Sequence, residues 1–232
     1  MDSPYTSRIE VATDKLLSTV EKLDDETVAE PSLLPGWDRA MVLTHLSAHA
    51  EGLTRAMEGA VRGEVAELYP GGRQARDAEI EAGRGTKARD VGRRLKESSA
   101  RVLSVIEAAP GEVWHAPAVH YRLGEVQIGM MVVSRLREVE IHHVDLDFGY
   151  SPADWPTEWV IEEMDRAMLD LPSRLPSGTA VVLAATDTDQ HWVAGSGEAV
   201  ELDGPLSELF AWVIGRVGAV GGQAGPDLGP WR

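Results

Sequence analysis

Two pairs of residues of the types that bind metal ions lie at helical spacing in segments that are otherwise apolar. Glu138 and His142 are four residues apart, and so are His45 and His49. Residues four apart lie above one another on one face of an α-helix, so each pair presents two side chains in the same direction. Two such helices, packed together, would bring imidazole nitrogens and a carboxylate to one divalent ion.

The residues alone leave a second interpretation open. A histidine on an apolar helix face is most often a hydrogen-bonded core residue. Glutamate, however, is rarely buried unless it is paired or bound to a metal, and Glu138 is flanked by the apolar residues Val132, Val133, Val139 and Ile141. This favours a ligand role for Glu138, although Arg135 is a candidate ion-pair partner. Asp145, one turn beyond His142, is a candidate to orient the imidazole of a ligand.

The composition limits which reactions the protein can perform with its own side chains and which partners it can bind. The 232 residues contain no cysteine, which excludes disulfides, thiolate metal ligands and a cysteine nucleophile. A formal charge of −16 disfavours nucleic acid and anionic membranes as partners, because both attract positive surfaces. The chain shows neither an apolar signal core nor the roughly 18 apolar residues of a membrane span. We therefore expect a cytoplasmic protein with a small-molecule substrate.

Apolar periodicity predicts a mainly helical first part of the chain. We expect long helices over residues 9–23, 38–63, 86–108 and 124–148, a short one over 76–82, and a further one over 155–171. Asp38 is the expected N-cap of the second helix. In the helix over 124–148, Val126 and Met130 are expected to be buried. Four long helices predict a bundle.

The pattern changes at Pro172. Residues 179–185, 191–193 and 198–202 have the composition of strands, residues 205–217 of a helix, and residues 221–231 of a loop or tail. The predicted fold is therefore α+β. It comprises a helical bundle over residues 1–171 and a small α/β domain over residues 172–232.

The chain resembles the mycothiol-dependent maleylpyruvate isomerase family, a branch of the DinB-like metal-binding four-helix bundles with a small C-terminal α/β domain. The resemblance covers nearly the whole chain. It is carried by residues 32–37 with 43–46, 76–83, 137–146 and 204–216.

The resemblance implies a set of site residues. It assigns zinc to His45, Glu138 and His142, and it implies that Arg216, near the end of the last helix, reaches the active site. At the position of His49 the family typically has asparagine or another residue, so a role for His49 as a further ligand stays open. Three nitrogen and oxygen ligands leave one zinc position for water or substrate, as in catalytic sites.

The implied activity is a zinc- and mycothiol-dependent cis–trans isomerisation of maleylpyruvate to fumarylpyruvate, a reaction of aromatic degradation. Zinc deprotonates a coordinated thiol, which would supply the nucleophile that a chain without cysteine lacks. The thiolate would add to the double bond, and its expulsion after rotation would leave the trans product. Arg216 would hold a carboxylate of the substrate with its planar fork. Without the resemblance, Arg216 would be a helix-end cation.

Two other functions stay open. The same zinc and mycothiol would serve an S-transferase that attaches the thiol to another electrophile. Alternatively, the bundle would be a non-catalytic metal-binding regulator in which His49 completes the coordination.

Overall fold

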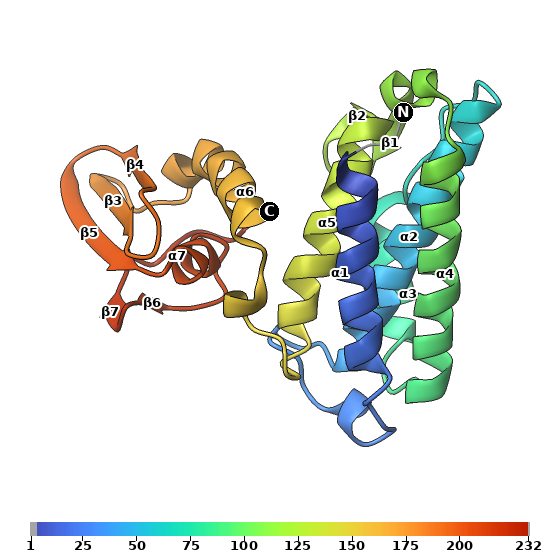
Figure 1. Ribbon diagram of the computed structural model, residues 1–232, viewed down its shortest axis with the longest axis horizontal. Helices are drawn as coiled ribbons and strands as arrows, with labels where there is room; N and C mark the ends of the chain where they lie inside the picture. Colours follow the sequence, from blue (N-terminus) through green and yellow to red (C-terminus); the bar gives the residue numbers. More distant parts are fainter. Residues whose placement is uncertain (1–3, 232) are drawn as a thin grey trace. The chain divides into compact units, whose positions relative to one another are not determined.

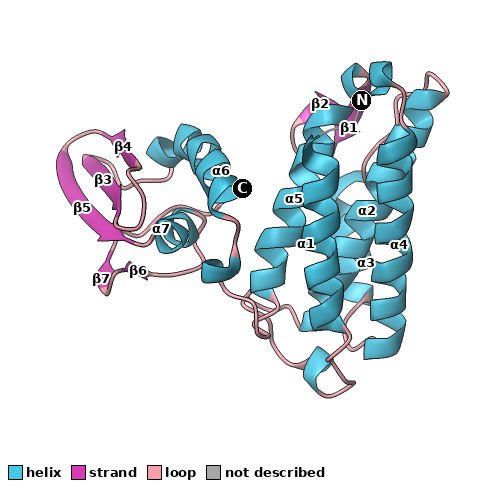
Figure 2. Ribbon diagram, viewed as in Figure 1, coloured by secondary structure: helices cyan, strands magenta, loops and turns pink. Residues whose placement is uncertain are grey.

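The computed structural model describes residues 4–231, and the chain is divided into two compact units between Tyr150 and Ser151 (Figure 1). The first unit is helical apart from one small hairpin, and the second combines helices with strands (Figure 2). The predicted α+β class is confirmed. Among the described residues, no helix has the length and apolar character needed to cross a membrane.

Four long helices form the bundle of the first unit: α1 (Pro4–Val20), α2 (Arg39–Val61), α4 (Ala88–Ala108) and α5 (Ile128–Asp145). Both α1 and α2 pack against α4 and α5, so the apolar stripes of the four helices meet in one core. The shorter α3 (Gly72–Ala82) lies against α2. Fully buried core residues include Ile9, Leu46, Leu95 and Val132.

Helix α2 is the most deeply buried helix of the bundle, and its start is fixed by a side-chain cap. Asp38 accepts a hydrogen bond from the backbone N–H of Met41 at 2.8 Å, which confirms it as the N-cap. The end of α3 comes very close to α2. A Cβ at Gly83 would lie only 2.2 Å from Oγ1 of Thr44, so this position needs a residue without a side chain. The close approach holds the end of α3 beside the first turns of α2.

A β-hairpin replaces the beginning of the helix expected over residues 124–148. Strands β1 (Pro117–His120) and β2 (Gly124–Gln127) pair in antiparallel fashion, and α5 begins only at Ile128. Gly124 has a φ of 73°, a left-handed conformation that ends the turn and cannot start a helix. The expectation for Met130 was also wrong, because Met130 is 59% exposed.

The second unit packs two helices with a three-stranded sheet. Its elements are α6 (Thr157–Asp170), β3 (Thr179–Ala185), β4 (His191–Gly195), β5 (Glu198–Gly204) and α7 (Leu206–Val213). In the strand order β4-β3-β5, β3 is antiparallel to β4 and parallel to β5. A two-residue pairing of β6 (Ala219–Val220) with β7 (Gln223–Ala224) partly replaces the loop expected from residue 221 onward.

Helix α6 groups with the second unit, whereas the sequence suggested a division after residue 171. The reason is aromatic packing. The ring of Phe210 on α7 contacts Trp155 and Trp159 in edge-to-face geometry, with centroids 5.3 and 5.6 Å away. These apolar contacts bury one face of α6 against α7. The division into a metal-binding bundle domain over residues 1–171 and a small α/β domain over residues 172–232 stays a prediction.

Candidate metal centre

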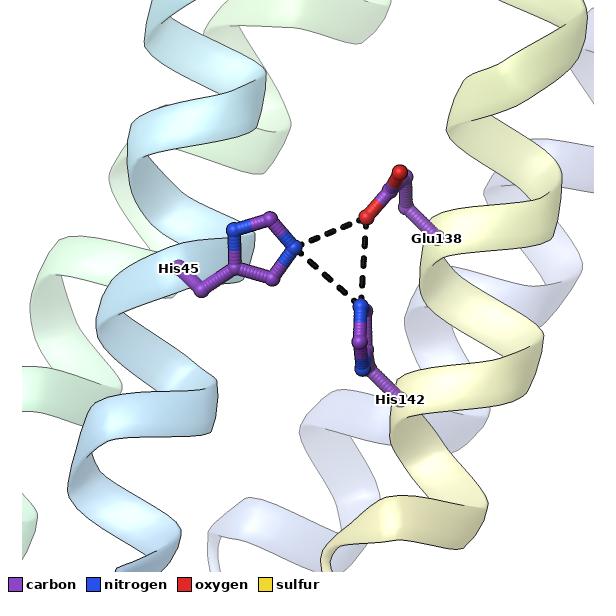
Figure 3. A group of neighbouring side chains, drawn as sticks. All are labelled: His45, Glu138 and His142. Atoms are coloured by element: carbon purple, nitrogen blue, oxygen red, sulfur yellow. Dashed lines mark hydrogen bonds and ion pairs between the residues drawn. The ribbon is translucent and has the colours of Figure 1, made fainter. Parts of the chain in front are cut away.

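The structure brings together the three side chains expected to bind zinc. His45 comes from α2, while Glu138 and His142 come from consecutive turns of α5 (Figure 3). Nε2 of His45 lies 2.8 Å from Oε2 of Glu138 and 3.1 Å from Nε2 of His142. The three ligand atoms all lie within 4.8 Å of one another. Two imidazole nitrogens and one carboxylate oxygen are a donor set that suits zinc and related divalent ions.

A carboxylate orients one of the two imidazoles. Nδ1 of His142 lies 2.7 Å from Oδ2 of Asp145, and Asp145 is completely buried. With the proton on Nδ1 donated to this carboxylate, the lone pair of Nε2 points toward His45 and Glu138. Metal-binding histidines usually have such a partner. The expected orienting role of Asp145 is therefore consistent with the geometry.

The charges of the three residues follow from burial and from their neighbours. Burial lowers the pKa of His45 to about 4, against the opposing effect of Glu138. Burial also opposes protonation of His142, but Asp145 and Glu138 outweigh it and raise the pKa of His142 to about 9. For Glu138, burial favours the neutral form, yet the hydrogen bonds from His142 and His45 hold its pKa well below the usual value. Glu138 is thus a carboxylate at neutral pH.

His49 lies beside this group but is not part of it. Its ring centroid is 6.4 Å from that of His45, and the cluster of ligand atoms found among residues 4–231 does not include it. His49 is buried, and its Nδ1 has no hydrogen-bond partner in the described part of the chain. Burial lowers the pKa of His49 to about 3, so the imidazole is neutral.

Arg135 was a candidate ion-pair partner for Glu138, but its hydrogen bonds go to other residues. The guanidinium is fully buried and donates to the carbonyl oxygen of Leu46 at 2.7 Å and to Oγ of Ser99 at 3.3 Å. Arg135 therefore ties α5 to α2 and α4. Arg135 and Glu138 lie three residues apart on α5, as expected, but the long side chain of Arg135 turns to other acceptors.

Sequence reasoning missed a second set of side chains at the centre. Nη2 of Arg76, on α3, lies 3.5 Å from Nδ1 of His45. The guanidinium also lies over the rings of Tyr69 and Tyr121, 5.8 and 5.3 Å from their centroids. Arg76 opens one of the stretches on which the family resemblance rested. No spacing rule, however, connects it to a histidine on another helix.

Arg216 belongs to the second unit. It follows α7 directly, where its N–H donates to the carbonyl of Ala211 at 2.7 Å and its Nη1 to that of Ile214 at 3.1 Å. These local bonds fix the turn that ends the helix. The part of Arg216 in an active site stays a prediction.

A helical bundle that gathers two imidazoles and a carboxylate on facing helices defines the class of this protein as a bundle with a candidate divalent-metal site. The chain belongs to the family described as mycothiol maleylpyruvate isomerase N-terminal domain, whose sequence profile matches residues 9–147. No curated protein sequence matches the chain.

Two solved structures share the fold over nearly the whole chain. The crystal structure of the mycothiol-dependent maleylpyruvate isomerase is 22% identical in sequence, with a TM-score of 0.86, and the match covers 98% of this chain and 95% of that one. The structure of a histidine-to-alanine variant of the mycothiol-dependent maleylpyruvate isomerase has a TM-score of 0.83 at 22% identity, covering 92% of this chain and 88% of that one. The predicted family is confirmed.

Proposed function

We propose that this protein is a zinc- and mycothiol-dependent isomerase that converts maleylpyruvate to fumarylpyruvate. The observation that carries the proposal is the convergence of His45, Glu138 and His142 in a chain of this family. Three ligands leave a coordination position open, and the side chain of Glu138 is 26% exposed, so the group is reachable from outside. Because the reaction uses a free thiol, we also propose that the protein works in the cytoplasm.

Each candidate site residue has a separate proposed role. His45, Glu138 and His142 would hold the zinc, with Asp145 fixing the ring of His142. When bound, zinc would stabilise the thiolate of mycothiol, which is the nucleophile that a protein without cysteine does not contain. Arg216 would bind a carboxylate of the substrate through two parallel hydrogen bonds.

The test is an isomerase assay on the zinc-loaded, full-length protein. Without thiol, maleylpyruvate should not be converted. Mycothiol at catalytic concentration should start the reaction, and dithiothreitol should serve poorly because it lacks the sugar and inositol groups that position the sulfur. Equal conversion without any thiol would contradict the proposal.

The alternative is an S-transferase that uses the same zinc and mycothiol on another electrophile. The identity of only 22% to the two solved structures favours keeping this alternative, since the same three ligands would serve both reactions. Product analysis separates the two. An isomerase returns the thiol, whereas a transferase consumes one thiol for each product. A metal-binding regulator is less favoured, because His49 lies outside the ligand group.

A further inference from the structure

A cationic side chain is held between two aromatic rings next to the candidate metal ligands. Arg76 projects from α3, Tyr69 precedes that helix, and Tyr121 lies in the turn between β1 and β2. The two tyrosine rings meet edge to face at 5.5 Å, and the guanidinium lies within 6 Å of both centroids. Cation–π contacts of this kind fix the position of a guanidinium and leave its N–H groups available.

Two hydrogen-bond donors of this cluster have no acceptor among residues 4–231. They are Nε of Arg76 and the hydroxyl of Tyr69, and both atoms are buried. Tyr69 is only 3% exposed. Buried polar groups in folded proteins are nearly always paired, so two neighbouring donors without acceptors indicate a place where a ligand supplies oxygen atoms.

The charge of Arg76 is only partly compensated. Its Nη1 contacts Oδ1 of Asp77 at 2.8 Å, but Asp77 is half exposed and occupies the other edge of the guanidinium. On the side away from Asp77, Nη2 lies 3.5 Å from Nδ1 of His45. Arg76 keeps 15% of its side chain exposed, so this positive charge is reachable in a chain whose formal charge is −16. The positive charge of Arg76 would attract an anion locally, although the overall negative charge of the chain disfavours anions.

We propose that Arg76 and the hydroxyl of Tyr69 bind a carboxylate of the electrophilic substrate beside His45, Glu138 and His142. This inference rests on the proposed function and names its substrate class, α,β-unsaturated carboxylates. The planar fork of arginine matches a carboxylate in a way that lysine does not. Mycothiol carries no carboxylate, so the anion comes from the substrate. Uncharged electrophiles lose this contact.

The test measures the binding of maleate to the zinc-loaded, full-length protein by calorimetry, without thiol, so that no turnover occurs. Arg76→Gln should weaken maleate binding about tenfold or more, and Tyr69→Phe about three- to tenfold, since each removes donors to the carboxylate. Arg73→Gln is the matched control, because Arg73 lies one turn earlier on α3 and its side chain is 79% exposed. Its affinity should stay that of the wild type. Dimethyl maleate, which has no charge, should bind the wild type much more weakly than maleate does.

Zinc content and circular dichroism are measured for every variant. Arg76→Lys provides a second variant that keeps the charge, and it should also bind maleate more weakly because it lacks the fork. Unchanged maleate affinity in either folded Arg76 variant overturns the inference, and so does a wild-type protein that binds no maleate. An affinity that is lost only together with zinc assigns Arg76 to holding His45 and also overturns it. Maleate binding through Arg76 in a protein that does not isomerise maleylpyruvate supports this inference while it contradicts the isomerase.

Discussion

The two units of the chain bury polar side chains very differently. In the second unit, Glu163 and Arg174 are the buried charged or polar residues among those described, and Arg174 donates to the carbonyls of Val213 and Gly229 as a purely structural tie. The bundle, by contrast, buries several such side chains along the facing helices α2 and α5, among them His45, His49, Arg135 and Asp145. Burying such groups is costly unless they are paired or used. The comparison therefore favours the bundle as the place of the metal centre, whereas the second unit has an ordinary apolar core.

The largest expected effect is the loss of metal when the bundle loses one ligand. Glu138→Ala should weaken zinc binding by at least about 100-fold, because one of three ligands and the only charged one is removed. His45→Ala and His142→Ala should behave in the same way. Elemental analysis of the purified variants measures the effect.

The matched control is His49→Ala, which removes a buried histidine four residues from His45 on the same helix. This variant should keep its zinc. Full retention of zinc in Glu138→Ala would contradict the ligand assignment, and loss of zinc in His49→Ala would support the regulator with four ligands.

Arg216 tests whether the second unit contributes to the chemistry at all. Arg216→Met should remain folded by circular dichroism but lose about 2–4 kcal/mol of transition-state stabilisation, which is about 30- to 1000-fold in kcat/KM. The local bonds of Arg216 to Ala211 and Ile214 involve the backbone or a single N–H, so the turn should survive. A folded variant with wild-type turnover would make Arg216 a helix-end cation and would sharpen the contrast between the two units.

The polar interior of the bundle should also make the stability of the metal-free protein depend on pH. In the folded chain, Asp145 and Glu138 overcome burial and raise the pKa of His142 to about 9, above the 6.5 of an unperturbed histidine. A raised pKa stabilises the fold fully below pH 6.5, and this stabilisation is lost as the pH rises from about 6.5 through 9. Its size is about 3 kcal/mol.

Urea unfolding of the protein, after its metal has been removed with a chelator, measures this effect between pH 6 and pH 10. Asp145→Asn provides the comparison, since it removes the main partner that raises the pKa of His142. The free energy of unfolding of the variant should fall much less over this range. Parallel curves for the two proteins would show that His142 does not carry the effect.

The smallest expected effect concerns the contact that holds α3 against α2. Gly83→Ala should destabilise the bundle by about 1–2 kcal/mol, because its Cβ would lie 2.2 Å from Oγ1 of Thr44 and the helices would have to separate. Thr44→Ala in the same chain should restore part of the loss. Chemical denaturation of the single and double variants gives both values, and equal stability of Gly83→Ala and wild type would show that the approach is looser.

Helical spacing predicted much of the bundle and singled out His45, Glu138 and His142, which the structure places together. The pairs at positions i and i+4 and the N-cap Asp38 depend only on local geometry, which sequence reveals. The hairpin over residues 117–127 was missed because each strand has only four residues, and the second strand begins at Gly124, where the sequence alone suggested the start of a helix. The contacts of Arg76 with Tyr69 and Tyr121 connect a helix with a loop and a hairpin turn, and no periodicity of the sequence links such positions. The partners of Arg135 depend on its side-chain direction within the packed core.

The residues of the metal centre and the residues proposed to hold the carboxylate lie on different kinds of element. His45, Glu138 and His142 are built into the two helices that form the core of the bundle, where a change of position would disturb packing. Tyr69 and Tyr121 lie on connections, and Arg76 lies on a short peripheral helix. Connections tolerate substitution and insertion better than core helices do. If Tyr69 and Arg76 hold the carboxylate as proposed, substitutions in the stretch from Tyr69 to Arg76 should change the preferred electrophile while the helices of the metal centre stay as they are.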